Sequence, residues 1–414
     1  GAEMPSNSDL IKWAEQGRLH TKYTDVTSAA AAGAGTATLT IGDVLVPGTG
    51  AIAIRVGQTI MISDSTAAST LSNKAIVTAV DIANGTIDVA YYELAGQGVA
   101  AGVVCSLFIY GSEFQKGSVG MQGQLEADDS IFSNSPIIIK DHYAVSGSDM
   151  AQIGWIEVTT ENGATGFLWY LKSEHETRLR FEDYLETAMV EAVPAEGGSG
   201  AAAIVEGVAS GVGNKGSEGL FYVVEERGNV WSGGNPTTLG DFDAIIQRLD
   251  KQGSIEENVL FVNREFGFDI DDMLAAQNAG YAGGTSFGLF DNDEEMALNL
   301  GFSGFRRGYD FYKTDWKYLN DPTMRGDIVG GAVNGVLVPA GSTTVYDQVL
   351  GKNAKRPFLH VRYRASETED RRYKTWITGS AGGASTSSLD AMEVNFLSER
   401  ALCTLGANNF FIFK

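Results

Sequence analysis

The sequence predicts an α+β protein with a small all-β domain near its N-terminus, and three observations lead to this class. Six runs rich in β-branched residues, separated by Gly, Asp and Asn, fill residues 34–112. A long, densely charged helix pattern covers residues 171–194. After residue 216, helix and strand patterns alternate. With 414 residues, 43% of them hydrophobic, the chain can form two or three domains with cores of their own.

Residues 1–33 are predicted to form an N-terminal arm. One short helix is expected in SDLIKWAEQGRL, with Ser8 as its N-cap. Leu10, Ile11 and Trp13 would give this helix a small apolar face. The Ala/Gly run AAAAGAGTA follows and is typical of a flexible joint. We therefore expect an arm here rather than a domain.

Residues 34–112 are predicted to form a β-barrel or β-sandwich domain of their own. The strand patterns are TATLTI, AIAIRV, TIMIS, KAIVTAV, TIDVAYY and VVCSLFIY. Asn84-Gly85 is a strong signal for a two-residue hairpin between two of these strands, because this dipeptide adopts the backbone angles that tight hairpin turns require.

Residues 113–165 are predicted to form an extended β-loop. Strands are expected at SPIIIK and HYAVSG, but the segment has few large apolar residues and too little core to fold alone. Two interpretations remain open. The segment is either a surface loop or a β-extension that packs on a neighbouring subunit.

Residues 166–235 begin with the long helix, whose apolar residues recur at helical spacing. Its remaining faces carry i,i+4 charge pairs, Glu174 with Arg178 and Glu176 with Arg180. Pro194 and a Gly/Ala run end the helix. The apolar stripe consists of Phe181, Leu185, Ala188, Met189 and Ala192.

Residues 236–345 and 346–414 are predicted to be mixed α/β. TTLGDFDAIIQRLDKQG is a helix capped by Thr238, NVLFVN a strand and FDIDDMLAAQNA a second helix. Strands follow at GYDFYKTDWKYL, GAVNGVLVPAG, RPFLHVRYRA and YKTWITG. The end, SERALCTLGANNFFIFK, is predicted to be a short helix followed by a strand.

Charge and cysteine usage exclude several classes of protein. A net charge of −22 disfavours binding to nucleic acid and to anionic membranes unless the basic residues cluster. No run of eighteen apolar residues is present, so no membrane span is expected. Cys105 and Cys403 lie in apolar segments, which argues against a disulfide scaffold or a thiolate metal site and fits a reducing cytoplasm.

No motif in the sequence predicts an enzyme, a cofactor site or a metal site. GVGNKG matches G-x-G-x-x-G, but a predicted strand, LFYVV, follows where a nucleotide fold needs a helix. DNDEEM lacks the turn glycine and the bidentate Glu of a calcium loop. The four histidines show no zinc-type spacing. We therefore expect no catalytic residue, no cofactor and no metal.

The basic residues cluster in GFRRGY and in KRPFLHVRYRASETEDRRYK. The second run alternates basic and aromatic residues, as either a nucleic-acid groove or a subunit interface would. The strongly negative net charge favours the interface, and the acidic residues 367–370 inside the run suggest a self-complementary surface.

The order of these elements resembles the major capsid protein of tailed bacteriophages, which has the Hong Kong 97-type fold. IFSNSPIIIKDHYAVSGSDMAQIG is similar to the returning limb of that family's extended loop, and LKSEHETRLRFEDYLETAMVEA to its spine helix. GSEGLFYVV with TTLGDFDAIIQRLDKQGSIEENVLFVN is similar to the entry to its axial domain, and SERALCTLGANNFFIF to the end of its peripheral domain. The resemblance covers residues 113–414 and is nearest to crAss-like and related phages. Residues 34–112 depart from the pattern as an inserted domain.

The resemblance implies a domain plan. Residues 166–235 would hold the spine helix and the first part of a peripheral domain, residues 236–345 the axial domain, and residues 346–414 the rest of the peripheral domain. The implied function is structural. Copies of the chain would assemble as pentamers and hexamers into an icosahedral or prolate head around double-stranded DNA, which they would contact only weakly and without specificity.

The implied partners are other copies of the chain, a portal, a prohead protease and cement or decoration proteins. The implied location is the virion, with assembly in the bacterial cytoplasm. Gly1 is either the end left by that protease or an expression scar. The family's Lys–Asn crosslink is not expected, although Lys116 in the loop is a candidate for its lysine. The residues expected at interfaces between subunits are Trp13, Lys116, Glu174, Arg178, Arg180, Glu182, Arg306, Arg307, Arg362, Arg364, Arg371 and Arg372.

Two other classes remain open at this stage. One is a carbohydrate-binding or other surface-binding β-rich module with an appended α/β domain, which predicts a monomer with aromatic residues in a cleft. The other is an enzyme with an aspartate/glutamate pair, which predicts a concave pocket with a raised carboxylate pKa.

Overall fold

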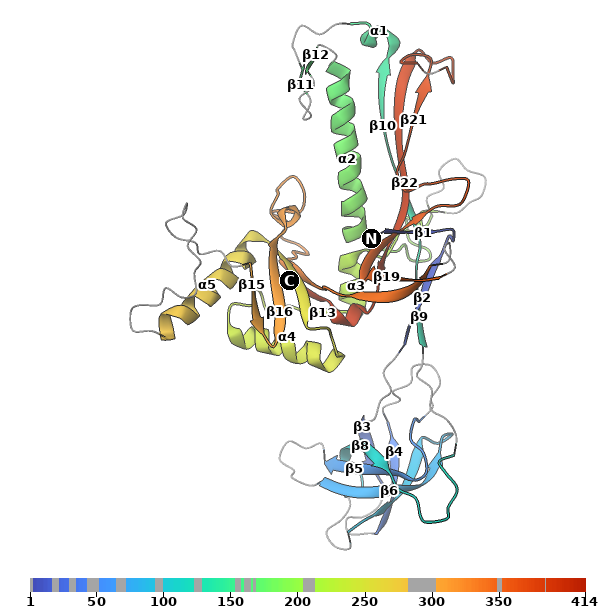
Figure 1. Ribbon diagram of the computed structural model, residues 1–414, viewed down its shortest axis with the longest axis vertical. Coiled ribbons are helices and arrows are strands. Elements are labelled where there is room, and N and C mark those ends of the chain that lie inside the picture. The colour runs from blue at the N-terminus through green and yellow to red at the C-terminus, as the bar shows by residue number, and fades with distance from the viewer. Residues whose placement is uncertain are drawn as a thin grey trace. The chain divides into compact units, whose positions relative to one another are not determined.

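A computed structural model describes residues 3–16, 22–29, 35–42, 52–64, 72–93, 100–122, 129–152, 158–159, 165–166, 169–203, 213–281, 303–347, 352–383 and 385–414 (Figure 1). The chain divides into two compact units. The main unit comprises Gly1–Trp13 with Ser133–Lys414, and the barrel unit comprises Ala14–Phe132. The chain passes between them through β2 (Ile11–Gln16) and β9 (Asp129–Asn134), which pair with each other.

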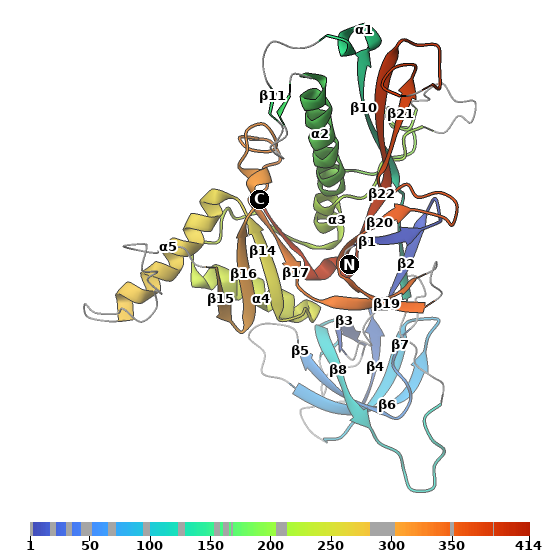
Figure 2. The same cartoon turned by 45° about the horizontal axis from the view of Figure 1, so that its top comes forward.

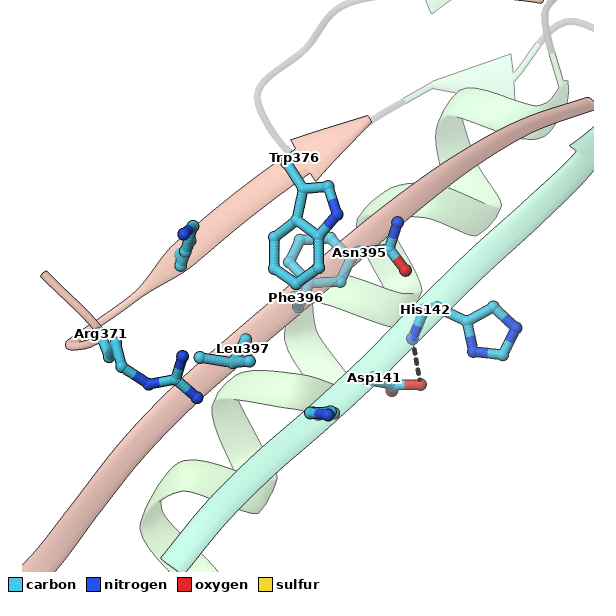
Figure 3. A pocket seen from close by; sticks show the side chains of 9 residues that line it. Asp141, His142, Arg371, Trp376, Asn395, Phe396 and Leu397 are labelled. Atoms are coloured by element: carbon cyan, nitrogen blue, oxygen red, sulfur yellow. Dashed lines mark hydrogen bonds between the residues drawn. The ribbon is translucent and has the colours of Figure 1, made fainter. Parts of the chain in front are cut away.

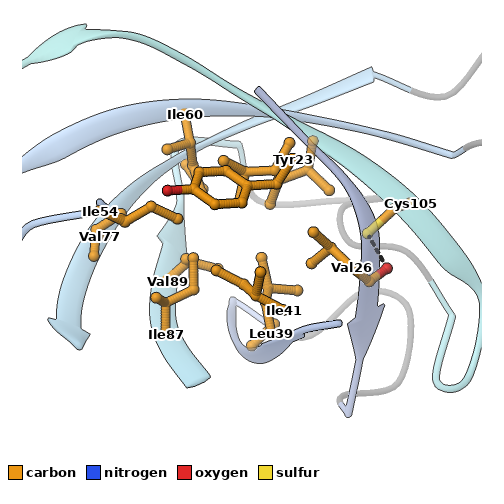
Figure 4. Close-up of a cluster of buried hydrophobic side chains, with 14 of the residues drawn as sticks. Tyr23, Val26, Leu39, Ile41, Ile54, Ile60, Val77, Ile87, Val89 and Cys105 are labelled. Carbon is orange, nitrogen blue, oxygen red and sulfur yellow. Dashed lines mark hydrogen bonds between the residues drawn. The ribbon is translucent and has the colours of Figure 1, made fainter. Parts of the chain in front are cut away.

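The barrel unit is a closed six-stranded antiparallel barrel in the order β3-β4-β7-β6-β5-β8. Alternate side chains of each strand point inward, as the two-residue period of a strand requires. Tyr23, Leu39 and Ile60 are among the buried core residues (Figure 4). The strands are β3 (Lys22–Ser28), β4 (Thr36–Ile41), β5 (Gln58–Asp64), β6 (Ser72–Asp81), β7 (Thr86–Tyr91) and β8 (Val104–Ser112).

Five of the six strand patterns in residues 34–112 are strands, and the exception is AIAIRV. Its described part, residues 52–56, is not a strand, although Ile52 and Ile54 still pack into the barrel core. A hairpin at Asn84-Gly85 is confirmed, but the two-residue loop is wrong, because Asp81 pairs with Thr86 and residues 82–85 form a four-residue turn. The sixth barrel strand is β3, which lies in the segment expected to be an arm.

The helix predicted in SDLIKWAEQGRL is wrong, because this segment forms strand β2. Ile11 and Trp13 are buried at a spacing of two while Lys12 between them is exposed. Ser8 does not cap a helix. Its hydroxyl accepts a hydrogen bond from the backbone N–H of Leu10, a local turn contact that competes with helix initiation.

The first sheet of the main unit is built around β22 (Ala391–Thr404), the longest strand of the described residues. β10 pairs along one edge of β22, while β21 and then β20 pair along the other. β1 adds to β20 in parallel. The neighbouring strands are β10 (Ile137–Ser146), β20 (Leu359–Arg364), β21 (Lys374–Gly379) and β1 (Glu3–Ser6).

This sheet overturns one prediction and confirms another. The helix predicted at SERALCT is wrong, because these residues lie in β22, where β10 and β20 supply backbone partners on both edges. The strands predicted at SPIIIK and HYAVSG are confirmed as one continuous strand, β10, which pairs with β22 in this sheet. The short α1 (Gly147–Met150) follows, capped by Ser146.

The long helix is confirmed as α2 (Trp169–Glu191), and it packs along one face of this sheet (Figure 2). Phe181 and Leu185 of the predicted stripe are buried against β10 and β22. The Phe181 ring stacks on Phe396 with centroids 5.6 Å apart. Met189, one turn further, packs into a second cluster with α3 (Leu220–Arg227). The short β11 (Val158–Thr159) and β12 (Thr165–Gly166) precede α2.

The strand predicted at LFYVV is wrong, because these residues open α3. Leu220, Phe221, Val223 and Val224 are all buried. A single strand would turn neighbouring side chains to opposite faces, whereas the i, i+3 and i+4 spacing of a helix brings this set to one core. Residues 211–212 of the glycine-rich GVGNKG lie outside the described residues.

The second sheet of the main unit has the order β13-β23-β17-β14-β16-β15. On β23, Phe411 and Phe413 face a core shared with α4 and α5, while Ile412 faces the cluster that holds α3. The C-terminal strand therefore lies in this sheet and not with the rest of residues 346–414. The strands are β13 (Asn229–Trp231), β14 (Glu257–Val262), β15 (Gly304–Arg307), β16 (Tyr309–Asp315), β17 (Gly335–Pro339) and β23 (Phe411–Phe413).

The two helices predicted for this region are confirmed as α4 (Leu239–Gln252) and α5 (Arg264–Tyr281). Thr238 caps α4 in a capping box with Asp241, as the sequence predicted, and Gly253 ends it at φ 67°. The remaining elements are the 3₁₀ turns η1 (Lys317–Leu319) and η2 (Ala407–Asn409) and a two-stranded ribbon of β18 (Ser342–Asp347) and β19 (Lys352–Pro357).

Candidate subunit interfaces

One face of the ribbon β10–β22–β21 is open, whereas α2 covers the other (Figure 3). The register places Lys140, Leu397 and Lys374 in one row across the three strands. His142, Asn395 and Trp376 form the next row. Because Val394 and Phe396 face α2, these two rows face away from it. We call this surface the open ribbon face, made up of Ile138, Lys140, His142, Lys374, Trp376, Asn395 and Leu397.

The open ribbon face combines apolar and cationic groups around a hollow of about 640 Å³ (Figure 3). The side chain of Ile138 is 53% exposed and that of Trp376 37% exposed. The Lys374 ammonium lies 5.9 Å from the centroid of the Trp376 ring. It also pairs with Glu369 and holds the pKa of that carboxyl below its usual value. Lys140 is exposed on β10, at one edge of the face.

The charged side of α2 pairs differently from the sequence prediction. The Arg180 guanidinium donates two hydrogen bonds of 2.9 Å to the carboxylate of Asp141 on β10 instead of pairing with Glu176. Glu176 lies 3.7 Å from Lys172. Glu182 accepts a 3.5 Å hydrogen bond from the Tyr373 hydroxyl. The charges of α2 therefore fasten the helix to the sheet beneath it as well as facing solvent.

Glu174 and Arg178 also lie on α2, Glu174 half-buried and Arg178 exposed. Tyr373 next to Arg178 and Glu182 has a raised pKa, mainly because its hydroxyl is partly buried and also because Glu182 lies nearby. Leu179 and Tyr184 are exposed apolar residues between these charges.

The predicted basic cluster near the C-terminus mainly holds the N-terminal segment of the same chain. Arg364 pairs with Asp9 at 2.7 Å and Arg372 with Glu3 at 2.5 Å, so both flank the added strand β1. Arg371 pairs with Glu399 at 2.6 Å.

Arg362 belongs to the same cluster but is only 5% exposed. Its Nε donates to Nε2 of the buried His360 at 3.4 Å. Burial and the neighbouring Arg362 lower the pKa of His360 to about 4. The uncharged imidazole therefore accepts this hydrogen bond at neutral pH, and Arg362 is covered by its own protomer.

The other predicted residues are scattered over the chain. Arg306 pairs with Asp310 at 3.2 Å, and Arg307 binds Asp243 of α4, which lowers the pKa of that carboxyl. Trp13 is buried in β2 and Lys116 is exposed in the barrel unit. Gly1 lies outside the described residues.

Sequence reasoning missed an apolar loop between η1 and β17. Val329 at its tip is 93% exposed, with Ile328 and Met324 also exposed. Arg325 anchors the loop by donating to the Gly331 carbonyl at 2.7 Å. The signal was present in DPTMRGDIVGG, where two apolar residues stand between turn-forming residues.

Neither cysteine is poised as a nucleophile. Burial raises the pKa of Cys105 to about 11 and that of Cys403 to about 12, so both thiols are protonated at neutral pH. Among the described residues, no group of three or more His, Cys, Asp or Glu side chains could hold a metal ion. In the same part of the chain, no helix is long and apolar enough to cross a membrane.

Solved structures similar to this chain include a phage capsid and an encapsulin. One is the mature capsid of bacteriophage PhiM1, at 11% identity, with 73% of this chain and 78% of that chain covered and a TM-score of 0.36. A structure from Microbacterium phage Oxtober96 has 10% identity, 90% and 94% coverage and a TM-score of 0.37. The SrpI encapsulin of Synechococcus elongatus has 9% identity, 70% and 77% coverage and a TM-score of 0.37.

No protein-family model and no curated protein sequence matches the chain. Identities near 10% and TM-scores below 0.5 do not by themselves establish a family.

Proposed function

We propose that this chain is the major capsid protein of a tailed bacteriophage and that it forms a closed shell by self-association. The observation that carries the proposal is the two-layer arm of α2 and the ribbon β10–β22–β21. The 23 residues of α2 make a rod about 35 Å long. The rod buries one stripe against the sheet, while its other faces and the open ribbon face stay exposed.

In an isolated monomer, an arm of this kind would leave apolar side chains exposed to water. Ile138 and Trp376 on one side and Leu179 and Tyr184 on the other remain partly in water, which loses the favourable burial of apolar surface. A lattice of identical subunits would cover these surfaces. It would also explain why exposed cations and carboxylates alternate along the arm, since charge pairs across an interface fix its register.

The order of parts supports the same proposal. An N-terminal strand, a β-ribbon that leads to an inserted barrel, one long helix on a long-stranded sheet and a mixed α/β region follow one another along the chain. This is the order on which the resemblance to the Hong Kong 97-type fold rests. The second sheet would be the axial domain, which surrounds the centre of pentamers and hexamers and presents the apolar loop with Val329.

The net charge supports a shell that encloses DNA without adhering to it. At −22 the chain would repel the phosphate backbone, and most of its basic cluster is already paired with its own carboxylates. Each contact between subunits would be weak. Because each copy makes many at once, the closed shell would be stable while single contacts remain reversible.

Negative-stain electron microscopy of the expressed full chain, with light scattering on the same sample, tests the proposal. Uniform hollow shells, or rings of five and six subunits, are the expected result. A monodisperse monomer at every salt and protein concentration tried would contradict it.

A further inference from the structure

The barrel unit exposes aromatic side chains in an unusual proportion. It contains seven aromatic residues, of which Tyr23 alone is fully buried. Four others are 40–47% exposed, although a barrel of this size has room for large side chains in its core. Exposed aromatic clusters of this kind mark binding surfaces in soluble proteins. The four residues are Tyr92, Phe108, Tyr110 and Phe114.

We call the surface that carries these four side chains the aromatic patch. Phe108 and Tyr110 point outward from β8 at a spacing of two. The Lys74 ammonium lies 5.6 Å from the centroid of the Tyr110 ring, and the backbone N–H of Tyr92 donates to the Lys74 carbonyl at 3.1 Å. The Tyr92 hydroxyl in turn donates to the carboxylate of Glu113, the residue before Phe114.

Two cations flank the aromatic patch. Lys22 lies opposite Phe108 in the β3–β8 pairing, and Lys74 lies opposite Met61, whose other neighbour is Phe108. The outward row across four strands therefore reads Lys22, Phe108, Met61, Lys74. The barrel unit has five basic residues against eleven acidic ones, whereas at the patch two lysines stand beside the single carboxylate of Glu113 named above.

The main unit carries the complementary charge. It contains 41 of the chain's 52 acidic residues and 25 of its 30 basic residues, which leaves it strongly negative. An apolar centre with a cationic rim is complementary to an acidic protein surface that has apolar residues within it. In a shell, such surfaces on other copies would be the nearest ones available and at high effective concentration.

We propose that the aromatic patch of the barrel unit binds an acidic surface on the main unit of a second copy of this chain. The inference deepens the proposed self-assembly and rests on it. The inserted barrel would then function as a link between neighbouring subunits. The Lys74 side chain lies over the Tyr110 ring, where a sugar would have to stack, so the patch suits a carboxylate-bearing protein better than a glycan.

Site-specific photocrosslinking tests this contact. p-Benzoylphenylalanine replaces Phe108 in the full chain, and a second sample carries it at Ile82, an exposed residue in the turn between β6 and β7. Chains labelled with ¹⁴N and ¹⁵N are mixed before assembly, so that mass spectrometry separates links between copies from links within one. We expect links from position 108 to the main unit of another copy, in roughly tenfold higher yield than from position 82.

Charge variants test the cationic rim with a matched control. Lys22→Gln with Lys74→Gln lowers the net charge by two, and so does Thr36→Glu with Thr40→Glu on the outward side of β4. Only the lysine pair is expected to reduce the yield at position 108, by roughly fivefold, because lost charge complementarity costs about 1 kcal/mol. Circular dichroism checks that both variants stay folded.

The outcomes separate this contact from the shell itself. Shells that form while position 108 links only within its own chain, or to nothing, would overturn the contact and leave the proposed function standing. Links between copies in the absence of shells or rings would support the contact and contradict the capsid. A glycan array tests the alternative ligand. If Phe108→Thr with Tyr110→Thr abolished binding to the array but left the photocrosslinks between copies from a position outside the patch unchanged, the patch would be a carbohydrate-binding site.

Discussion

The carboxylate of Glu191, the last residue of α2, accepts a 2.6 Å hydrogen bond from the guanidinium of Arg325 in the loop after η1. The same oxygen accepts a 2.7 Å bond from the Tyr318 hydroxyl. Arg325 also lies 4.9 Å from the centroid of the Phe221 ring of α3. One arginine therefore ties the end of the long helix to the second sheet's loop and to α3.

Arg325→Gln should destabilise the main unit by about 1–3 kcal/mol, because it leaves a partly buried carboxylate without its cation. Thermal unfolding followed by circular dichroism measures the effect. Arg264→Gln removes the pair with Asp315, which is more exposed, and should change stability by less than about 0.5 kcal/mol. Equal effects of the two variants would show that Arg325 is an ordinary surface charge.

Phe181→Ala should cost about 3–5 kcal/mol, because Phe181 is fully buried between α2 and the sheet, where it contacts Phe396 and Tyr373. Leu179→Ala, two residues earlier on the exposed side of α2, should stay within about 0.5 kcal/mol. Urea unfolding with a probe in the main unit distinguishes the two. A small loss at Phe181 would mean that α2 is held to the sheet by its charges rather than by its apolar stripe.

Arg180→Glu should weaken assembly and lower the melting temperature, because it places a carboxylate next to Asp141. Combining it with Asp141→Arg should restore both, since the pair is re-formed with its charges exchanged. Arg178→Glu, on the exposed side, tests contact with a neighbouring copy alone. Unchanged shells after reversing Arg178 and Arg180 together would refute a role of this helix face in assembly.

Lys140→Glu with Trp376→Ser should abolish shells while leaving the protomer folded, because both side chains lie on the open ribbon face and are not part of the core. Lys317→Glu with Tyr312→Ser makes a similar change, a lysine to Glu and an aromatic residue to Ser, at exposed positions in η1 and β16. Electron microscopy measures shell formation by both double variants, and circular dichroism checks that both stay folded. Normal shells from the first pair would exclude the open ribbon face as an interface.

His360 should make stability depend on pH below neutrality. Its pKa is lowered to about 4 in the fold by burial and by Arg362 and Arg356, against about 6.5 when unfolded. The unfolded chain therefore binds the extra proton first. His360 therefore makes its full contribution to the free energy of unfolding above pH 6.5. This contribution is lost as the pH falls towards 4, by about 3 kcal/mol in all.

Replacement His360→Gln should flatten this pH dependence relative to the wild type, whatever its effect at neutral pH. His142→Gln, at an exposed position on the open ribbon face, should not. Melting temperatures between pH 4 and 8 give the comparison. If His360→Gln kept the pH dependence of the wild-type melting temperature, that dependence would come from carboxylates instead of His360.

Local signals accounted for much of the fold. The long helix, its apolar stripe, the capped α4 and the Asn84-Gly85 hairpin were all predictable, because each depends on residues close together in sequence. The failures share a cause. SERALCT and LFYVV have apolar patterns that suit either a helix or a strand, and only the available partners decide between them.

The candidate interfaces were predictable in composition but not in geometry. The sequence identified Arg364, Arg371 and Arg372 as a basic cluster but could not indicate that Glu3, Asp9 and Glu399 reach them. The contacts with Asp9 and Glu3 join residues more than 350 positions apart, and the contact between Arg371 and Glu399 joins residues 28 positions apart. The open ribbon face was missed for the same reason, since it exists only through the register between β10, β22 and β21.

The sequence by itself determined the class of this protein, the position of its long helix, its strand-rich inserted region and its strong negative charge. Periodicity, capping and turn chemistry are properties of neighbouring residues and can be read along the chain. The tertiary structure alone decided which cations are already paired, that Arg362 is buried, and that Phe108 and Tyr110 point outward from the barrel. Burial and pairing depend on which segments distant in sequence come into contact, and the free energy of those contacts is set by the whole fold.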